Sequence, residues 1–160
     1  MNIIEKTYTL NGKLTKRTKT DTIVLHHRAG NGDVESIDRT HKNQDWICIG
    51  YHFYVRKDGT IYRGRQEDAV GAHASGSNST SIGICAEGNF ETDIMPEVQK
   101  QSIKELVAYL KEKYNIAIII GPEGGIEEKE VKLLKSSGAK VVSLGKRILR
   151  TETAGMTTTA

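Results

Sequence analysis

The sequence predicts an α/β fold in which a mixed central sheet carries helices on both of its faces. Three observations support this: short apolar runs of strand length, an Asp-Gly turn between two alternating segments, and one long amphipathic pattern of helical period. The chain has 160 residues, which is roughly the size of one domain. We therefore expect one layered core through residue 115, on a sheet of about five or six strands.

The first elements follow a polar, extended lead-in over residues 1–20. Residues 22–27 read Thr-Ile-Val-Leu-His-His, a short apolar run with a polar end. This pattern predicts a buried strand whose end reaches a site. Asp33 then stands where a side chain can cap a helix, which we expect over residues 34–43.

A hairpin is predicted next. Residues 51–56 and 60–63 flank Lys57-Asp58-Gly59, and an Asp-Gly pair between alternating segments favours a hairpin because both turn positions adopt positive φ. The small and polar residues 71–79 indicate a long irregular loop, and residues 81–86 a further strand.

The clearest helix is predicted over residues 96–114. Pro96 suits its first turn, and apolar residues recur at helical spacing along one face. This stripe consists of Ile103, Leu106, Val107, Leu110 and Tyr114. Beyond it we expect a strand over 116–120, a helix over 127–135 and a last strand over 141–144.

Composition narrows the classes of function. The net charge is only +3, well short of the dense positive charge typical of nucleic-acid-binding proteins, so we expect no nucleic-acid partner. No apolar run approaches the ~18 residues of a membrane helix, and the first residues lack the pattern of a signal peptide. We therefore expect a cytoplasmic protein without a membrane partner, in which Cys48 and Cys85 are free thiols.

Six short segments then follow one another in a fixed order. They are Thr22-Ile-Val-Leu-His-His27, Ile49-Gly-Tyr-His-Phe53, Asp58-Gly-Thr-Ile-Tyr-Arg-Gly64, Gly71-Ala-His73, Asn78-Ser-Thr-Ser-Ile-Gly-Ile84 and Glu87-Gly-Asn-Phe90. In this order they resemble the zinc-dependent N-acetylmuramoyl-L-alanine amidases, the group that includes peptidoglycan recognition proteins and phage lysozyme-type amidases. The resemblance covers about residues 1–115.

This resemblance implies a function in degrading the bacterial cell wall. The family cuts the amide that joins the lactyl group of N-acetylmuramic acid to L-alanine, so peptidoglycan is the expected partner. The implied cofactor is Zn²⁺, which polarises the carbonyl and lowers the pKa of a bound water toward ~7. If the protein is endolysin-like, it is made in the cytoplasm and acts on the wall after release.

Carried over residue by residue, the resemblance implies roles for two central residues. His26 matches the first metal ligand of the family. Tyr51 matches a tyrosine that stabilises the oxyanion or passes a proton, so we expect it to be catalytic. From the residues alone, a structural histidine at His26 and a core or groove aromatic at Tyr51 stay open.

The resemblance also implies a substrate-binding groove. Its expected residues are His73, Asn78, Ser79 and Trp46. Trp46 is equally compatible with a place in the core. Cys85 is interpreted as a small buried hydrophobe, with a position facing the site as the alternative. Structural or surface positions are expected for His27, His41 and His52.

The family pattern stops after the long helix. There the family has a Gly-His-Xaa-Asp-type second ligand, and a Cys or Asp before Pro-Gly as the third. This chain instead reads Ile-Ala-Ile-Ile-Ile-Gly-Pro-Glu-Gly-Gly over residues 116–125, and residues 117–160 contain no His, Cys or Asp. We therefore expect an incomplete zinc site and weak zinc binding, and a non-catalytic peptidoglycan-binding module is the alternative.

Residues 117–160 carry a second resemblance, to the C-terminal part of SPOUT-class ribosomal-RNA uridine methyltransferases. It implies a fusion of an amidase-like domain, residues 1–115, with a methyltransferase-like fragment, residues 116–160, which could dock on the same sheet. The implied S-adenosylmethionine contacts are Gly121, Glu123, Gly124, Gly125, Leu144 and Gly145. Because the rest of that fold is missing, we do not expect the cofactor to bind, and a plain strand-to-helix turn is the alternative. The origin of the fusion and the oligomeric state stay open.

Overall fold

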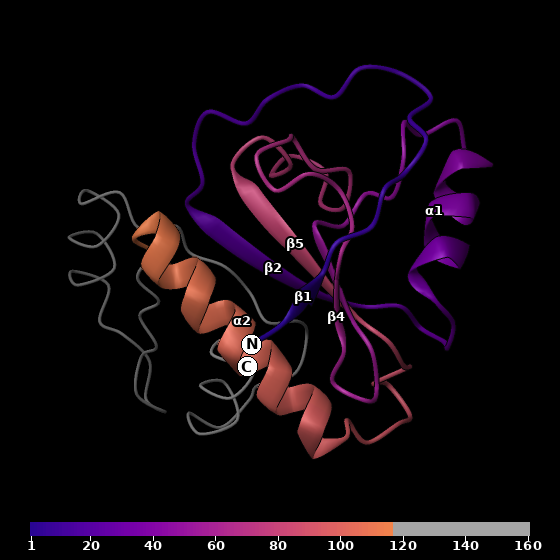
Figure 1. Cartoon of the computed structure of the whole chain (residues 1–160), viewed down its shortest axis with the longest axis vertical. Coiled ribbons are helices and arrows are strands. Elements are labelled where there is room, and N and C mark those ends of the chain that lie inside the picture. Colours follow the sequence, from indigo (N-terminus) through magenta and orange to yellow (C-terminus); the bar gives the residue numbers. More distant parts are fainter. Residues whose placement is uncertain (117–160) are drawn as a thin grey trace. The chain divides into compact units, whose positions relative to one another are not determined.

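The computed structural model describes residues 1–116, so the strand, helix and strand expected in the tail lie outside the described residues. Two helices and five strands make up this part (Figure 1). The strands are β1 (Ile3–Ile4), β2 (Thr22–His27), β3 (Phe53–Val55), β4 (Ile61–Arg63) and β5 (Ser81–Ala86). The helices are α1 (Val34–Lys42) and α2 (Glu97–Tyr114).

The five strands form one mixed sheet in the order β1-β4-β3-β5-β2. Only β3 and β4 pair antiparallel, and the other neighbours are parallel. The predicted α/β class with a mixed sheet is therefore confirmed. Because β2 and β5 are parallel, their carboxyl ends meet at one edge, and His26 lies beside Cys85 in the register.

The predicted hairpin between β3 and β4 is also confirmed, but its turn differs from the expectation. Gly59 has a φ of +85°, whereas Asp58 is not among the residues with positive φ. The Asp58 carboxylate instead accepts a hydrogen bond from Thr60 N at 2.9 Å. The connection is the predicted segment Lys57-Asp58-Gly59, closed by a hydrogen bond from Arg56 N to the Thr60 carbonyl at 2.9 Å, but only its glycine adopts positive φ.

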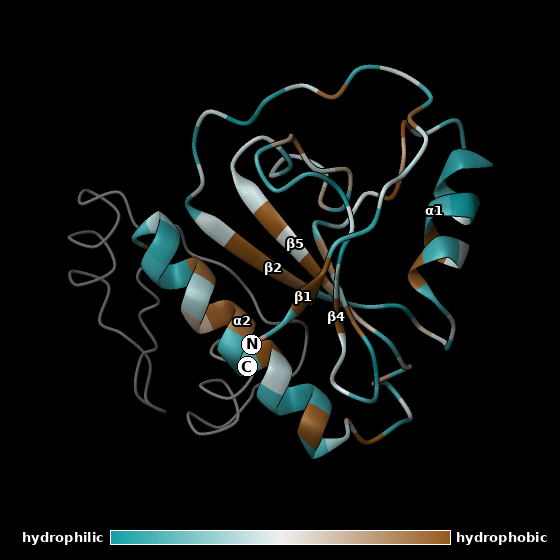
Figure 2. Cartoon of the chain, viewed as in Figure 1, coloured by the Kyte–Doolittle hydropathy of each residue, from teal (hydrophilic) through white to brown (hydrophobic). Residues whose placement is uncertain are grey.

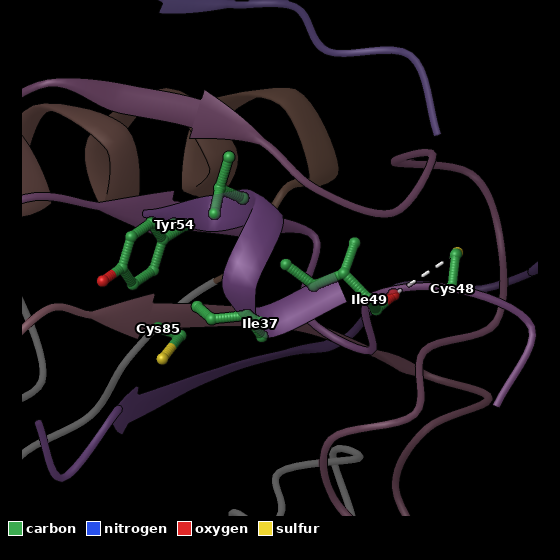
Figure 3. Packing of buried hydrophobic residues seen from close by; sticks show 6 residues of the cluster. Ile37, Cys48, Ile49, Tyr54 and Cys85 are labelled. Atoms are coloured by element: carbon green, nitrogen blue, oxygen red, sulfur yellow. Dashed lines mark hydrogen bonds between the residues drawn. The ribbon is translucent and has the colours of Figure 1, made fainter. Parts of the chain in front are cut away.

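Helix α1 begins at the predicted cap. Asp33 Oδ1 accepts a hydrogen bond from Ser36 N at 2.8 Å, which satisfies a free N–H of the first turn. The buried face of the helix carries Val34 and Ile37. Figure 3 shows Ile37 among the core side chains that include Tyr54 of β3 and Cys85 of β5. Helix α1 therefore covers the face of the sheet on which these two residues stand.

Helix α2 covers the other face. Neighbours along a strand point to opposite faces, so Phe53 and Val55 are turned away from Tyr54. Helix α2 contacts β3, and Gln99 Nε2 donates to the Val55 carbonyl at 3.0 Å. Four residues of the predicted apolar stripe are buried: Ile103, Leu106, Val107 and Leu110. The fifth, Tyr114, is only partly buried, and its hydroxyl donates a hydrogen bond to Glu67 Oε1 at 2.6 Å. Helices on both faces of the sheet are thus confirmed.

Burial differs across the sheet. Every residue of β5 is buried, whereas β2 lies at the edge and is only partly covered. Figure 2 shows hydrophobic residues along the middle of both strands and a predominantly hydrophilic α1. Cys48 and Cys85 are buried free thiols, as expected. Neither helix of residues 1–116 is long and apolar enough to cross a membrane.

Candidate active site

Three of the residues singled out by sequence lie together in the structure. His26 Nε2 is 3.0 Å from His73 Nδ1. The ring centroid of Tyr51 is 5.2 Å from that of His26 and 6.4 Å from that of His73. The end of β2, the segment before β3 and the loop before β5 each contribute one of these side chains, so the cluster depends on the tertiary fold.

The sheet positions His26. Its register partner Cys85 belongs to the core cluster under α1, and residues paired side by side in parallel strands point to the same face. Gly83 stands two positions before Cys85 and therefore faces the same side. His26, Cys85 and Gly83 therefore share one face of the sheet, and the candidate site lies on this face.

Two glycines leave room for the His73 ring. A Cβ on Gly83 would lie 2.5 Å from His73 Cγ, and a Cβ on Gly71 would lie 2.5 Å from His73 Cδ2. Both distances are far below van der Waals contact, so the ring occupies space that any other residue would fill. His73 is thus seated directly against the backbone of its own loop and of β5.

The predicted groove residues Asn78 and Ser79 lie in different environments. Asn78 Oδ1 accepts hydrogen bonds from His73 N at 2.8 Å and Ala74 N at 2.9 Å. This side chain shapes the loop that carries His73. Ser79 is exposed at the surface of the same loop.

Both histidines at the centre are neutral imidazoles. Burial, followed by the neighbouring His52 and His26, lowers the pKa of His73 to about 3. Burial, with a smaller contribution from His27, lowers the pKa of His26. At neutral pH the pair therefore shares one hydrogen bond without a net charge.

Tyr51, whose ring neighbours both histidines, is a protonated phenol. Burial and the neighbouring Cys85 thiol raise the pKa of Tyr51 to about 12. Burial likewise raises the pKa of Cys85 to about 12, so its sulfur is a thiol and a poor nucleophile. Cys85 is wholly buried, and it lies beside His26 in the strand register.

His41 joins the cluster although its sequence position indicated only a structural or surface role. Its ring centroid is 4.5 Å from Trp46 and 5.5 Å from Tyr51. Its Nδ1 accepts a hydrogen bond from Gly50 N at 3.0 Å, which fixes the ring. Trp46 is half-buried against His41, so it extends the aromatic surface that begins at Tyr51.

The remaining two histidines support the backbone, as expected. The fully buried His52 accepts a hydrogen bond from Gly83 N at Nδ1 (3.0 Å) and donates from Nε2 to the Ala69 carbonyl (3.0 Å). His27 Nδ1 accepts from Phe90 N at 3.0 Å. Ser81 is a residue that the sequence analysis missed: its Oγ lies 3.4 Å from His73 Nε2.

The donor atoms of the described residues do not fit a three-ligand zinc site. Within residues 1–116 no three His, Cys, Asp or Glu side chains converge on a point that could hold a metal ion. The expected ligand His26 is hydrogen-bonded to His73, and the Cys85 thiol is wholly buried. The residues expected to contact S-adenosylmethionine lie outside the described part: Gly121, Glu123, Gly124, Gly125, Leu144 and Gly145.

Comparison with known proteins gives a consistent assignment. A family model described as N-acetylmuramoyl-L-alanine amidase matches residues 16–130, a range that contains the whole cluster and runs past the expected junction near residue 116. The endolysin of Klebsiella phage KP32 is 40% identical over 118 residues, which cover 68% of this chain and 78% of that protein. Peptidoglycan-recognition protein SC2 of Drosophila melanogaster is 36% identical over 95 residues, or 53% of this chain and 52% of that protein.

A solved structure is similar as well. The endolysin N-acetylmuramoyl-L-alanine amidase LysCS from Clostridium intestinale URNW superposes with a TM-score of 0.70 and is 46% identical. The match covers 72% of this chain and 76% of that one.

Proposed function

The chain belongs to the N-acetylmuramoyl-L-alanine amidase family, and from this membership we propose that it hydrolyses peptidoglycan at the amide between N-acetylmuramic acid and L-alanine. The observation that carries the proposal is the cluster of His26, Tyr51 and His73 at one edge of the sheet. The similarity to phage endolysins favours an enzyme that is made in the cytoplasm and reaches the wall on release.

The cluster offers two of the groups that amide hydrolysis needs. Water adds to the amide carbon, the C–N bond breaks, and the stem peptide leaves with a free amino terminus. Tyr51 carries its proton at neutral pH and can donate a hydrogen bond to the oxyanion that forms. His26 is a neutral imidazole whose lone pair can bind a cation or take the proton of the attacking water.

Zinc is the cofactor that the family implies. Since the donors of residues 1–116 do not converge on one ion, we assign no step to it. Of the ligands expected in the family, His26 is the one that this chain keeps.

The test is an assay on purified sacculi with and without added zinc, in which mass spectrometry detects released stem peptides. We expect release by the natural chain, and its loss in His26→Ala and Tyr51→Phe. His27→Ala is the matched control, because His27 stands next in the strand but bonds to Phe90 instead of the cluster. No release by the natural chain under either condition would end the proposal.

A non-catalytic peptidoglycan-binding module is the second candidate. It is favoured by the lack of a three-ligand cluster within residues 1–116 and by the aromatic surface of Tyr51, His41 and Trp46, a kind of surface that packs well against sugar rings. Cosedimentation with sacculi separates the candidates. Retention without release, weakened by Trp46→Ala, supports the module, and absence of retention excludes it.

The methyltransferase hypothesis for residues 117–160 stays a prediction. The amidases and recognition proteins compared above lend it no support, and the family match extends into this region to residue 130. A calorimetric titration with S-adenosylmethionine is the direct test, and we expect no heat of binding.

A further inference from the structure

We propose that Ser81 and His73 form a positioning relay that sets the tautomer of His26, with the proton on Nε2 and the lone pair on Nδ1. The relay matters for catalysis only if the proposed amidase function is right. Its existence, however, is a property of the described side chains and can be measured without substrate.

The first step of the relay is the Ser81 hydroxyl, which has one proton to give. It lies 2.7 Å from the Ser77 carbonyl oxygen, which can only accept, and 3.4 Å from His73 Nε2. The Ser81 hydroxyl therefore donates its proton to the Ser77 carbonyl oxygen, with which it makes the shorter contact. Ser81 Oγ therefore presents a lone pair to His73.

The second step follows at His73. Its Nε2 faces the Ser81 lone pair and must carry the proton to make that contact. A neutral imidazole with a proton on Nε2 has its lone pair on Nδ1. That nitrogen is the one that lies 3.0 Å from His26.

The third step sets His26. Because His73 Nδ1 accepts, His26 Nε2 must be the donor in this bond. The lone pair of His26 is then on Nδ1, for which residues 1–116 provide no hydrogen-bond partner. His26 Nδ1 is therefore the atom available for chemistry, whether it binds a cation or accepts a proton.

The seat of His73 makes this arrangement rigid. Gly71 and Gly83 leave the space that the ring fills, and Asn78 fixes the backbone at His73 through two hydrogen bonds. By accepting the hydrogen bond from His26 Nε2, His73 disfavours the other tautomer of His26, in which the proton is on Nδ1. A histidine with a fixed tautomer is a better base or ligand than one that divides between two states.

The experiment is long-range proton–nitrogen correlation NMR on the full chain with ¹⁵N-labelled histidine at neutral pH. We expect His26 to show a protonated Nε2 and an unprotonated Nδ1. His73→Phe removes the acceptor, so His26 should become a mixture of both tautomers. His73→Asn keeps a carbonyl oxygen that can accept from His26 and should restore the single tautomer.

His41→Phe is the matched control. It replaces another ring of the same cluster, but one that is not hydrogen-bonded to His26, so the tautomer should not change. A proton on Nδ1 of His26 in the natural chain would overturn the proposal. So would an unchanged tautomer ratio in a folded His73→Phe. If that variant fails to fold, the spectrum of the natural chain still decides the question.

Activity separates this proposal from the proposed function. We expect His73→Phe to lower kcat by about 10- to 100-fold with little change in KM, and His73→Asn to recover part of it. If the chain shows the expected tautomer but no amidase activity, the relay proposal stands and the proposed function is wrong. If the chain is fully active while His26 divides between both tautomers, the proposed function stands and the relay proposal is wrong.

Discussion

Gly83 is one of the two glycines that leave room for the His73 ring. Its φ is not in the left-handed region, so the backbone would accept alanine, but the new Cβ would lie 2.5 Å from the His73 ring. We expect Gly83→Ala to push the ring from His26, to lower the free energy of unfolding by about 1–3 kcal/mol, and to abolish hydrolysis. Urea denaturation and the sacculus assay measure both effects.

Gly30→Ala is the matched control for this change. A Cβ on Gly30 would meet nothing within 4 Å, and its φ is not in the left-handed region either. Its stability should stay within about 0.5 kcal/mol of the natural chain. If Gly83→Ala and Gly30→Ala lose equal stability and activity, the space that Gly83 leaves for the His73 ring has no special role.

Sequence identified some residues of the site and missed others for a physical reason. His26 and Tyr51 stand in ordered motifs, so a pattern along the chain reveals them. The contacts of His41 and Ser81 arise only when the helix packs on the sheet and the loop folds over β5. Asn78 illustrates the opposite case: the motif contains it, but its side chain is occupied by the backbone of its own loop.

At the scale of the element, α1 depends on its N-cap residue, Asp33. Asp33 bonds to Ser36 N through its side chain, and the helix buries only a short face. We expect Asp33→Ala to lower the free energy of unfolding by about 1 kcal/mol, since the N–H of Ser36 loses its acceptor. Chemical denaturation provides the value.

Asp33→Asn serves as the control for this helix. Asparagine keeps the acceptor oxygen, so most of the stability should remain. If Asp33→Asn is as unstable as Asp33→Ala, the charge of Asp33 near the helix dipole, and not the hydrogen bond, stabilises the helix.

The helices and strands were predictable because local patterns specify them. The cap at Asp33, the proline before α2 and the apolar run of β2 each determine an element within a few residues of chain. The turn at Asp58 was wrong in detail, because its conformation is set by the register of the two strands it joins. Strand order cannot be deduced from such local signals, since β5 inserts between two strands that precede it in sequence.

At the scale of the whole molecule, the donor inventory predicts weak zinc binding. All five histidines lie between His26 and His73, and residues 117–160 offer only glutamates among the usual ligands. We expect clearly less than one zinc per chain after dialysis against dilute metal, measured by elemental analysis. One tightly bound zinc per chain that is lost in His26→Ala would contradict this prediction and would show that further side chains bind the metal beside His26.

Acid stability is a second property of the whole molecule, and it depends on the buried imidazoles. Burial, together with the nearby Arg17 and Arg65 guanidinium groups, lowers the pKa of His52 to about 4 from an ordinary value of 6.5. The pKa of His73 falls to about 3, again mainly through burial. Between pH 4 and 6.5 the unfolded chain therefore binds protons at both positions that the folded chain does not bind.

The sign of the effect follows from this difference. The folded-state pKa values lie below the unfolded ones, so stability from these histidines is complete above about pH 6.5 and is lost as the pH falls toward 4. Each histidine contributes up to about 1.4 kcal/mol per pH unit. Urea denaturation at several values between pH 5 and 7.5 measures the slope, in a range where most carboxylates stay ionised. His52→Gln should reduce this slope by about one proton, and a free energy of unfolding that is flat across the range would contradict the prediction.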